Sequence, residues 1–231
     1  MKTATATIFL SLAITTAYLA QPAKVSLSQS SGPSLKSTAD RSKIRNLIDA
    51  MGPLTWTEDS LRALAKEGDK APSDLSIEIS MTTDVGKRQT AVQALQYLKN
   101  VDDRFALASL FASDRENPVA YRAVLTFKTL KGEPVEIQMK FRPIILQYMR
   151  LGPSTLQTAA FSVANHVPDP IYLPVLKLCL NSRYVGSGDE ANIIGAIAKI
   201  DRKEALKVVA DRKELLRRSA EDAFKSTGAG Y

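Results

Sequence analysis

The 231-residue sequence has only one cysteine, Cys179, and only one histidine, His166. A single cysteine cannot form a disulfide within the chain, and it excludes the zinc sites that need several thiolates. A single histidine excludes metal sites built from several imidazoles, and any Ser-His-Asp triad would have to include His166. The fold must therefore be stabilised by packing, because neither disulfides nor these metal sites are available.

The positions of these two residues favour structural roles. His166 lies at the end of a predicted helix, where a cation interacts favourably with the negative helix terminus or a neutral imidazole satisfies a carbonyl. This local role is preferred to catalysis. Cys179 follows Leu176 and Leu178 and precedes Leu180, which predicts a buried structural thiol rather than an exposed thiol that pairs with another chain.

The charge is moderately positive, with 31 Lys and Arg against 24 Asp and Glu and a formal net charge of +7. Such a balance favours anionic surfaces, but it is too diffuse to identify one partner. After residue 20 the sequence has no apolar run long enough to span a membrane. A hydrophobic content of 45% in a chain of this length is sufficient for one well-packed domain.

The N-terminal region divides into two segments. Residues 1–20 place Lys2 before an apolar stretch centred on residues 8–14, which is the pattern of a signal peptide, with an uncleaved membrane anchor as the alternative. Residues 21–43 are rich in Ser, Pro, Lys and Thr and have almost no large apolar residue, so we expect a disordered linker. We therefore expect an exported protein, periplasmic or secreted. If residues 1–20 stay uncleaved, they tether it to the membrane.

Helical periodicity begins at Ile44, which places the folded domain at residues 44–225 and a flexible tail at 226–231. Thr57, Asp84, Asp102, Asn117, Asp169, Asp189 and Asp201 occupy predicted N-cap positions, and Ser154 opens the most regular helix. From Asp84 onward, four apolar helical segments recur at intervals of about 33 to 36 residues, and a second helix candidate follows each one. This spacing predicts an all-α fold, a solenoid of antiparallel helix pairs.

Residues 57–225 resemble HEAT-like repeats. The resemblance is carried by the helix pairs, by Asp or Asn with Pro at the turns, by small alanines on the facing surfaces and by an Arg early in a unit, such as Arg88. It implies a right-handed stack used mainly to bind other macromolecules. The chain departs from the pattern because it lacks a repeated Val-Arg pair in every unit.

Two segments also fit a strand. Ile77, Ile79 and Met81 alternate after Pro72, although Leu75 and Ile79 also suit a helix. Residues 135–141 alternate strictly, and Lys131-Gly132-Glu133-Pro134 could form a hairpin turn that pairs them with the preceding segment. An α+β fold with one hairpin at residues 122–141 is therefore the alternative, and in the helical reading a helix starts at Pro143.

Other candidate motifs are better explained by structural roles than by binding or catalysis. Gly186-Ser187-Gly188 precedes a helix, but no Lys-Ser or Lys-Thr follows it, so a turn is favoured over a phosphate-binding loop. The acidic pairs Asp102-Asp103, Asp189-Glu190 and Glu221-Asp222 lie at predicted helix starts or on polar helix faces. The sequence thus offers no catalytic residue, no metal ligand and no cofactor site, and Arg217-Arg218 are expected to cap the end of the stack.

Basic residues are concentrated in the central units, at Lys87, Arg88, Arg122, Lys128, Lys131, Lys140, Arg142 and Arg150. We expect a non-enzymatic, exported scaffold or adaptor that binds another protein. The alternative is electrostatic binding of an anionic envelope polymer or lipid through the basic surface. Nucleic acid is disfavoured, because Tyr121 and Tyr148 are the nearest aromatic residues for base stacking and because it would be an unusual partner for an exported protein. The sequence does not identify the binding residues.

Overall fold

The structure is a computed structural model that describes residues 35–52, 55–181 and 186–226. These residues form eleven α-helices and three short 3-10 helices, and no described residue is in a strand, so the predicted all-α class is confirmed. The elements are α1 (Leu35–Ala50), α2 (Glu58–Gly68), α3 (Pro72–Met81), α4 (Val85–Gln93), η1 (Ala94–Tyr97), α5 (Val101–Ala112), α6 (Asn117–Thr126), η2 (Phe127–Leu130), α7 (Val135–Leu151), α8 (Ser154–His166), η3 (Pro170–Tyr172), α9 (Leu173–Leu180), α10 (Ser187–Ile200) and α11 (Arg202–Ser226).

Side-chain caps fix several helix starts. Thr57 forms a capping box with Ser60 at the start of α2, and Asp84 accepts a hydrogen bond from the Lys87 amide at the start of α4. Asp169 and Asp201 cap η3 and α11 in the same way. These four predicted caps are confirmed.

Three other predicted caps are wrong. Asn100, rather than Asp102, caps α5 by accepting from the amides of Asp102 and Asp103. Asn117 is the first residue of α6 and Asp189 lies within the first turn of α10, so neither is the N-cap residue. Acidic residues stabilise the first turn through the helix dipole as well as from the cap, and the two positions look alike in a sequence.

The hairpin alternative for residues 122–141 is also wrong, because these residues belong to α6, η2 and α7. Ile137, Phe141, Ile145 and Met149 are buried at intervals of four residues, while Val135 and Met139 are exposed. Gly132 makes the turn before α7 with a φ of +85°, which glycine adopts without strain. The helix does not start at Pro143, which lies inside α7 on its exposed side.

Residues 72–81 form α3, with Leu75 and Ile79 buried, so the strand reading of this segment is wrong. At the N-terminal end, α1 begins at Leu35, nine residues before the predicted domain boundary at Ile44 and inside the predicted linker. Arg41 and Lys43 in this early part of α1 form ion pairs with the buried carboxylates of Glu78 and Glu67. The predicted signal peptide (1–20), the first part of the predicted linker (21–34) and residues 227–231 lie outside the described residues.

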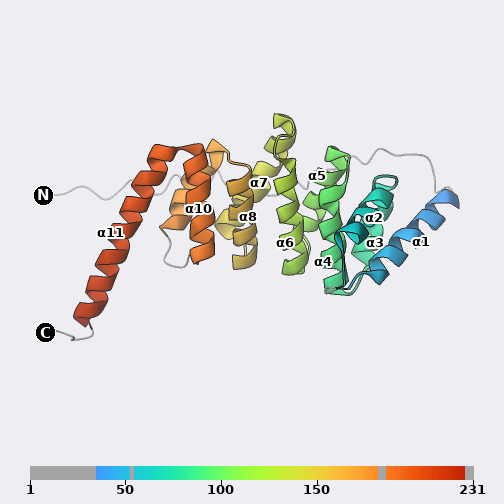
Figure 1. Cartoon of the computed structure of the whole chain (residues 1–231), viewed down its shortest axis with the longest axis horizontal. Helices are drawn as coiled ribbons and strands as arrows, with labels where there is room; N and C mark the ends of the chain where they lie inside the picture. The colour runs from blue at the N-terminus through green and yellow to red at the C-terminus, as the bar shows by residue number, and fades with distance from the viewer. Residues whose placement is uncertain (1–34, 53–54, 182–185, 227–231) are drawn as a thin grey trace, which may run out of the picture. The chain divides into compact units, whose positions relative to one another are not determined.

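The helices from α3 to α10 lie in two rows. We call α4, α6, α8 and α10 the even row, and α3, α5, α7 and α9 the odd row. Within each row every helix contacts the next, and α5, α7 and α9 also contact α6, α8 and α10 in turn. Figure 1 shows α4, α6, α8 and α10 standing side by side. The core therefore lies between the two rows.

The even row is packed through small residues. Ala91, Ala123, Ala160 and Ala196, one in each helix, are fully buried. At Gly195 a Cβ would lie only 2.9 Å from Oδ1 of Asn165, so the absence of a side chain permits the close approach of α8 and α10. The odd row buries large residues such as Phe111, Phe141 and Leu176, and the even row also buries Phe161 and Ile197.

The last helix, α11, is the longest, and residues 202–226 form it without a break. It contacts α10, and Ala205 and Val208 in its first half are buried. Leu215 and Leu216, farther along, are exposed.

Candidate functional site

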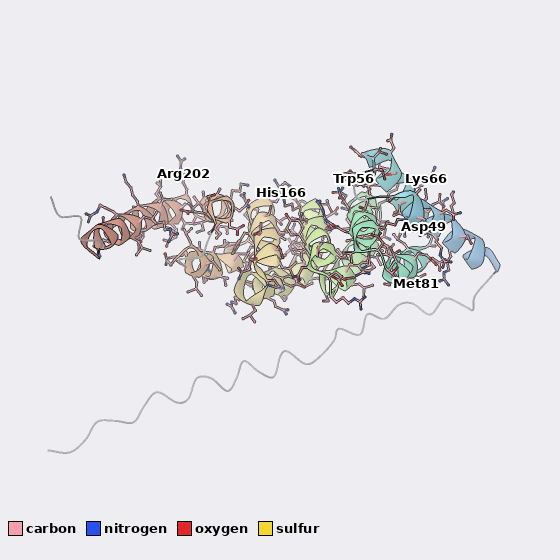
Figure 2. All side chains as sticks on the ribbon, turned by 90° about the horizontal axis from the view of Figure 1, so that it is seen from below. Asp49, Trp56, Lys66, Met81, His166 and Arg202 are labelled. Carbon is pink, nitrogen blue, oxygen red and sulfur yellow. The ribbon has the colours of Figure 1, made fainter. Side chains whose placement is uncertain are left out.

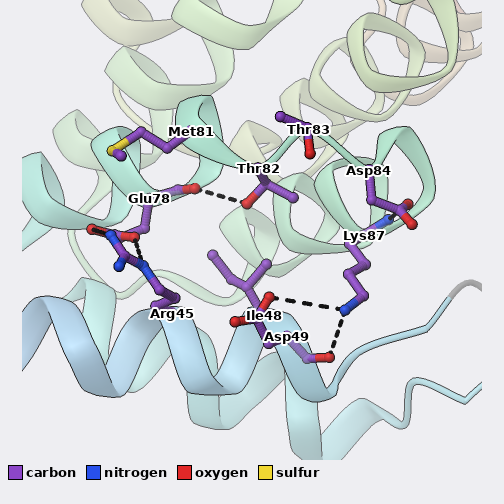
Figure 3. A pocket seen from close by; sticks show the side chains of 9 residues that line it. All are labelled: Arg45, Ile48, Asp49, Glu78, Met81, Thr82, Thr83, Asp84 and Lys87. Carbon is purple, nitrogen blue, oxygen red and sulfur yellow. Dashed lines mark hydrogen bonds and ion pairs between the residues drawn. The ribbon is translucent and has the colours of Figure 1, made fainter.

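A cleft of about 330 Å³ lies between the C-terminal half of α1, the end of α3 and the start of α4 (Figure 3). Helix α1 contributes a basic and an acidic side chain, the α3–α4 connection contributes two threonines, and α4 contributes a lysine. The lining residues are Arg45, Ile48, Asp49, Glu78, Met81, Thr82, Thr83, Asp84 and Lys87.

The charged groups of this cleft are mostly paired with each other. Nε of Arg45 donates to Glu78 at 2.8 Å, and Nε of Arg41 donates to the other carboxylate oxygen at 2.9 Å. Nζ of Lys87 donates to the Asp49 backbone carbonyl at 2.8 Å, which satisfies a carbonyl at the end of α1 (Figure 3). The lining has no imidazole and no thiol, so the cleft can hold a small polar molecule but presents no Cys-His or Ser-His pair for nucleophilic catalysis.

Glu78 is the most buried of these charges, with a side chain only 2% exposed. Burial disfavours its ionised form, but hydrogen bonds from Arg45 and Arg41 outweigh burial and hold the pKa of Glu78 below its ordinary value. Glu67 is held in the same way by Lys43 and Lys70, which lower its pKa. Both carboxylates join α1 to the helices that follow, which is a structural role.

His166 is the last residue of α8, as predicted, and its side chain is exposed. Burial, followed by the positive charges of Lys131, Lys128 and Lys199, lowers its pKa. The Asn165 carbonyl is satisfied by another residue, since Nζ of Lys199 donates to the Asn165 backbone oxygen at 2.6 Å and to its Oδ1 at 2.8 Å. His166 thus lies among lysines that favour its neutral form.

Cys179 is half-buried, and its Sγ lies 3.5 Å from the Met149 carbonyl oxygen. Burial raises the pKa of the thiol, and the charge of Arg150 acts in the opposite direction. Leu176 and Leu180 are buried as expected, but Leu178 is 70% exposed, so only part of the predicted apolar shell forms. The raised pKa indicates a thiol of low reactivity.

The acidic pairs do not converge on one pocket. Asp102 faces Lys140 at 3.6 Å, while burial and the charges of Asp102 and Asp69 raise the pKa of Asp103. Oδ2 of Asp189 accepts from the Thr158 hydroxyl at 3.0 Å. Gly186-Ser187-Gly188 forms the start of α10. The side chains of Glu221 and Asp222 lie outside the described residues.

The predicted basic surface is only partly formed. Arg88 is buried between the Thr82 carbonyl and Asp114, and Arg142 pairs with Asp169. Arg122 lies 5.9 Å from the ring of Tyr121, and the Tyr148 hydroxyl donates to the Ala112 carbonyl. Arg88, Arg142 and Tyr148 therefore join different parts of the fold, whereas the contact of Arg122 with Tyr121 lies within α6.

A smaller set of basic residues remains, at the C-terminal ends of η2, α8 and α10. It consists of Lys128, Lys131, His166 and Lys199, which we call the cationic edge. Sequence reasoning included the first two residues and missed the others. A signal was present, because Lys131, His166 and Lys199 recur at about the same interval of 33 to 36 residues as the helices themselves.

Exposed large apolar side chains are distributed unevenly. The large apolar residues of the even row, all within the described ranges, are buried or half-buried, whereas every helix of the odd row exposes at least one. The exposed residues of the odd row are Ile77, Met81, Leu110, Val135, Met139, Leu151 and Leu178. Leu151 and Leu178 are the most exposed, at 77% and 70%.

Among the described residues no group of three or more His, Cys, Asp or Glu side chains could hold a metal ion. No described helix has both the length and the apolar character that a membrane span requires. Comparisons with protein-family models and with curated protein sequences give no match to this chain. The inference of function therefore depends on the geometry of the chain itself.

Proposed function

We propose that this chain is a non-enzymatic scaffold or adaptor, a right-handed α-solenoid of antiparallel, HEAT-like helix pairs that binds another protein through its odd row. The single observation that carries this proposal is the exposure of large apolar residues on the odd row while the even row exposes none. Because residues 1–20 have the pattern of a signal peptide, we also propose that the chain acts after export.

The contacts between helices support the solenoid arrangement. Each helix from α4 to α8 contacts the helix two positions later, and the members of a pair contact each other. Such a pattern is typical of helix pairs that stack in one direction and contact mainly their neighbours. A stack of this kind presents one side of each pair along a continuous surface.

Leu151 and Leu178 form the centre of the proposed binding surface. The contact between Cys179 and Met149 brings the last turn of α7 against α9, and these two leucines flank that contact in the sequence. Exposed apolar residues grouped in this way are typical of protein interfaces, where a few buried anchors dominate the binding free energy.

The charge beside these leucines indicates the partner's chemistry. Arg150 is exposed, lies close enough to Cys179 to affect its pKa, and has no ion pair with a described residue. Lys140, Arg142 and Lys177 already pair with Asp102, Asp169 and Glu204. We expect the partner to present an apolar segment with an acidic residue that faces Arg150.

Site-specific photo-crosslinking in cells tests this proposal. A photoreactive residue at Leu178 is expected to capture one protein, and the same residue at Ala198, an exposed position on α10 of the even row, is expected not to capture it. Leu151→Ser or Arg150→Glu should reduce the capture at position 178 at least five-fold without changing the circular dichroism. Equal capture at both positions, or no effect of either variant, would contradict the proposal.

A further inference from the structure

The cationic edge brings basic residues together from three elements that are distant in the sequence. Lys128 belongs to η2, Lys131 follows it, His166 ends α8 and Lys199 lies in the last turn of α10. η2 contacts α8, and α8 contacts α10. Figure 2 shows His166 and Arg202, the first residue of α11, along the same edge of the helices.

The acidic residues that lie near these basic residues in the sequence interact with other groups. Asp169 pairs with Arg142, Asp201 accepts from the first amides of α11, and Glu133 faces Arg104 at 3.9 Å. Lys128, Lys131 and Lys199 form no ion pair with a described acidic residue. The edge therefore has an excess of positive charge.

The pKa shifts of Lys128 and His166 also indicate an excess of positive charge. Burial lowers the pKa of Lys128, which is partly buried without an anionic partner. The charged groups that affect His166 are Lys128 and Lys131 from the η2 side and Lys199 from α10, and all three are positive. An anion at this edge would relieve the repulsion among these groups.

Hydrogen-bond donors are also available. Two of the three N–H donors of the Lys199 ammonium are used by Asn165, so the third remains for a ligand. The side chains of Lys128 and Lys131 make no hydrogen bond with described residues. Lysine ammonium groups bind phosphate as point charges, without the planar fork with which arginine binds carboxylate and phosphate.

We propose that the cationic edge binds a linear anion that carries several phosphate groups. Adjacent helices pack about 8–10 Å apart, so an edge across three elements extends roughly 20 Å, which exceeds the reach of a single phosphate. This site does not depend on protein binding by the odd row.

The unique histidine allows a direct test in the full chain prepared without a histidine tag. NMR signals of the His166 imidazole are followed while tripolyphosphate is added at low salt. We expect the signals to shift saturably and the pKa of His166 to rise, because a bound anion favours the charged imidazole. By linkage, affinity should increase as the pH falls through the pKa of His166. No shift of these signals would overturn the proposal.

Charge-neutralising variants locate the site. Lys128→Gln and Lys199→Gln should each weaken tripolyphosphate binding about five-fold and reduce the dependence of log Kd on log salt by up to about one unit. Lys66→Gln is the matched control, since Lys66 is exposed on α2 and has no partner among the described residues. An equal loss in Lys66→Gln would show non-specific attraction and overturn the assignment.

Two further probes separate the chemical sources. Orthophosphate should bind at least ten-fold more weakly than tripolyphosphate if several phosphate groups engage the edge together. Vesicles that contain anionic lipid should bind more weakly than the same phosphate concentration supplied as tripolyphosphate. Vesicle binding that depends on Lys128 and Lys199, without tripolyphosphate binding, would overturn the proposal in favour of a membrane surface.

Discussion

The even and odd rows contribute comparable helices to one core but differ in the apolar residues that they expose. The even row has fully buried alanines at Ala91, Ala123, Ala160 and Ala196, and it exposes no large apolar residue. The odd row leaves large apolar side chains in solvent. Small residues allow helices to pack closely and leave little apolar side chain that could be exposed. Large apolar residues can be buried on one face of a helix and exposed on another. The comparison indicates that the even row maintains the stack and that the odd row is available for a partner.

The largest effect is expected where an ion pair joins the rows. Arg88 of α4 is only 5% exposed and contacts Asp114, in the connection between α5 and α6, at 3.2 Å. Asp114→Ala should reduce the free energy of unfolding by about 3 kcal/mol, because it leaves a buried guanidinium without its counter-charge. Urea denaturation measures this loss.

Asp102→Ala is the matched control, since Asp102 is exposed and its pair with Lys140 is at the surface. It should change the free energy of unfolding by less than about 0.5 kcal/mol. Similar losses in the two variants would show that the buried pair does not hold the rows together.

The next effect tests the role of small residues. Ala160→Leu adds three carbon atoms at a fully buried position of α8 and should reduce the free energy of unfolding by about 1–3 kcal/mol through overpacking. Ala198→Leu makes the same change at an exposed position of α10 and should have an effect within about 0.5 kcal/mol. Thermal denaturation distinguishes them, and equal melting temperatures would contradict the proposed importance of close packing.

Much of the helical fold could be predicted from the sequence, because apolar spacing and N-cap residues are local signals. The uncertainty at residues 135–141 has a physical cause. Ile137 and Phe141 fit both an alternating strand and a helix with period four, so the choice depended on burial against other helices. The start of α1 was missed because its early residues are polar, and ion pairs from Arg41 and Lys43 to distant carboxylates are not a local feature.

The candidate sites were harder to predict because they depend on which charges are already paired. In the sequence, Arg88 and Arg142 look the same as Lys128 and Lys131, yet the arginines form ion pairs with Asp114 and Asp169. Likewise, the neighbouring leucines predicted a buried Cys179, which is half-buried beside the exposed Leu178. Tertiary contacts determine these differences, and a single sequence does not show them.

A smaller effect on the free energy of unfolding is expected from the titration of Glu78, in α3 of the odd row, with acid. The pKa of Glu78 is lowered in the folded state, so its stabilising contribution is present above the unfolded value near 4.5 and is lost as the pH falls through the folded pKa. Glu78→Gln should cost about 1–2 kcal/mol at pH 7, because Arg41 and Arg45 are partly exposed and can be solvated.

The same variant should lose less stability than the original chain between pH 5 and pH 3. Urea denaturation at several pH values measures this difference. Glu58→Gln is the control, since Glu58 is exposed and pairs only with Arg62 on the same helix. An unchanged pH dependence in Glu78→Gln would contradict the assigned role of the carboxylate.

The smallest expected effect is the pH dependence of stability that comes from His166, the last residue of α8. The pKa of His166 is lowered below its ordinary value of 6.5, so the unfolded chain binds a proton more readily and stability should decrease as the pH falls through 6.5. Because the side chain is exposed, the decrease should be below about 0.5 kcal/mol. Lys131→Gln should raise the pKa of His166 in an NMR titration, while Lys66→Gln on α2 should leave it unchanged. If Lys131→Gln has no effect, the residues of the cationic edge are too widely separated to act together.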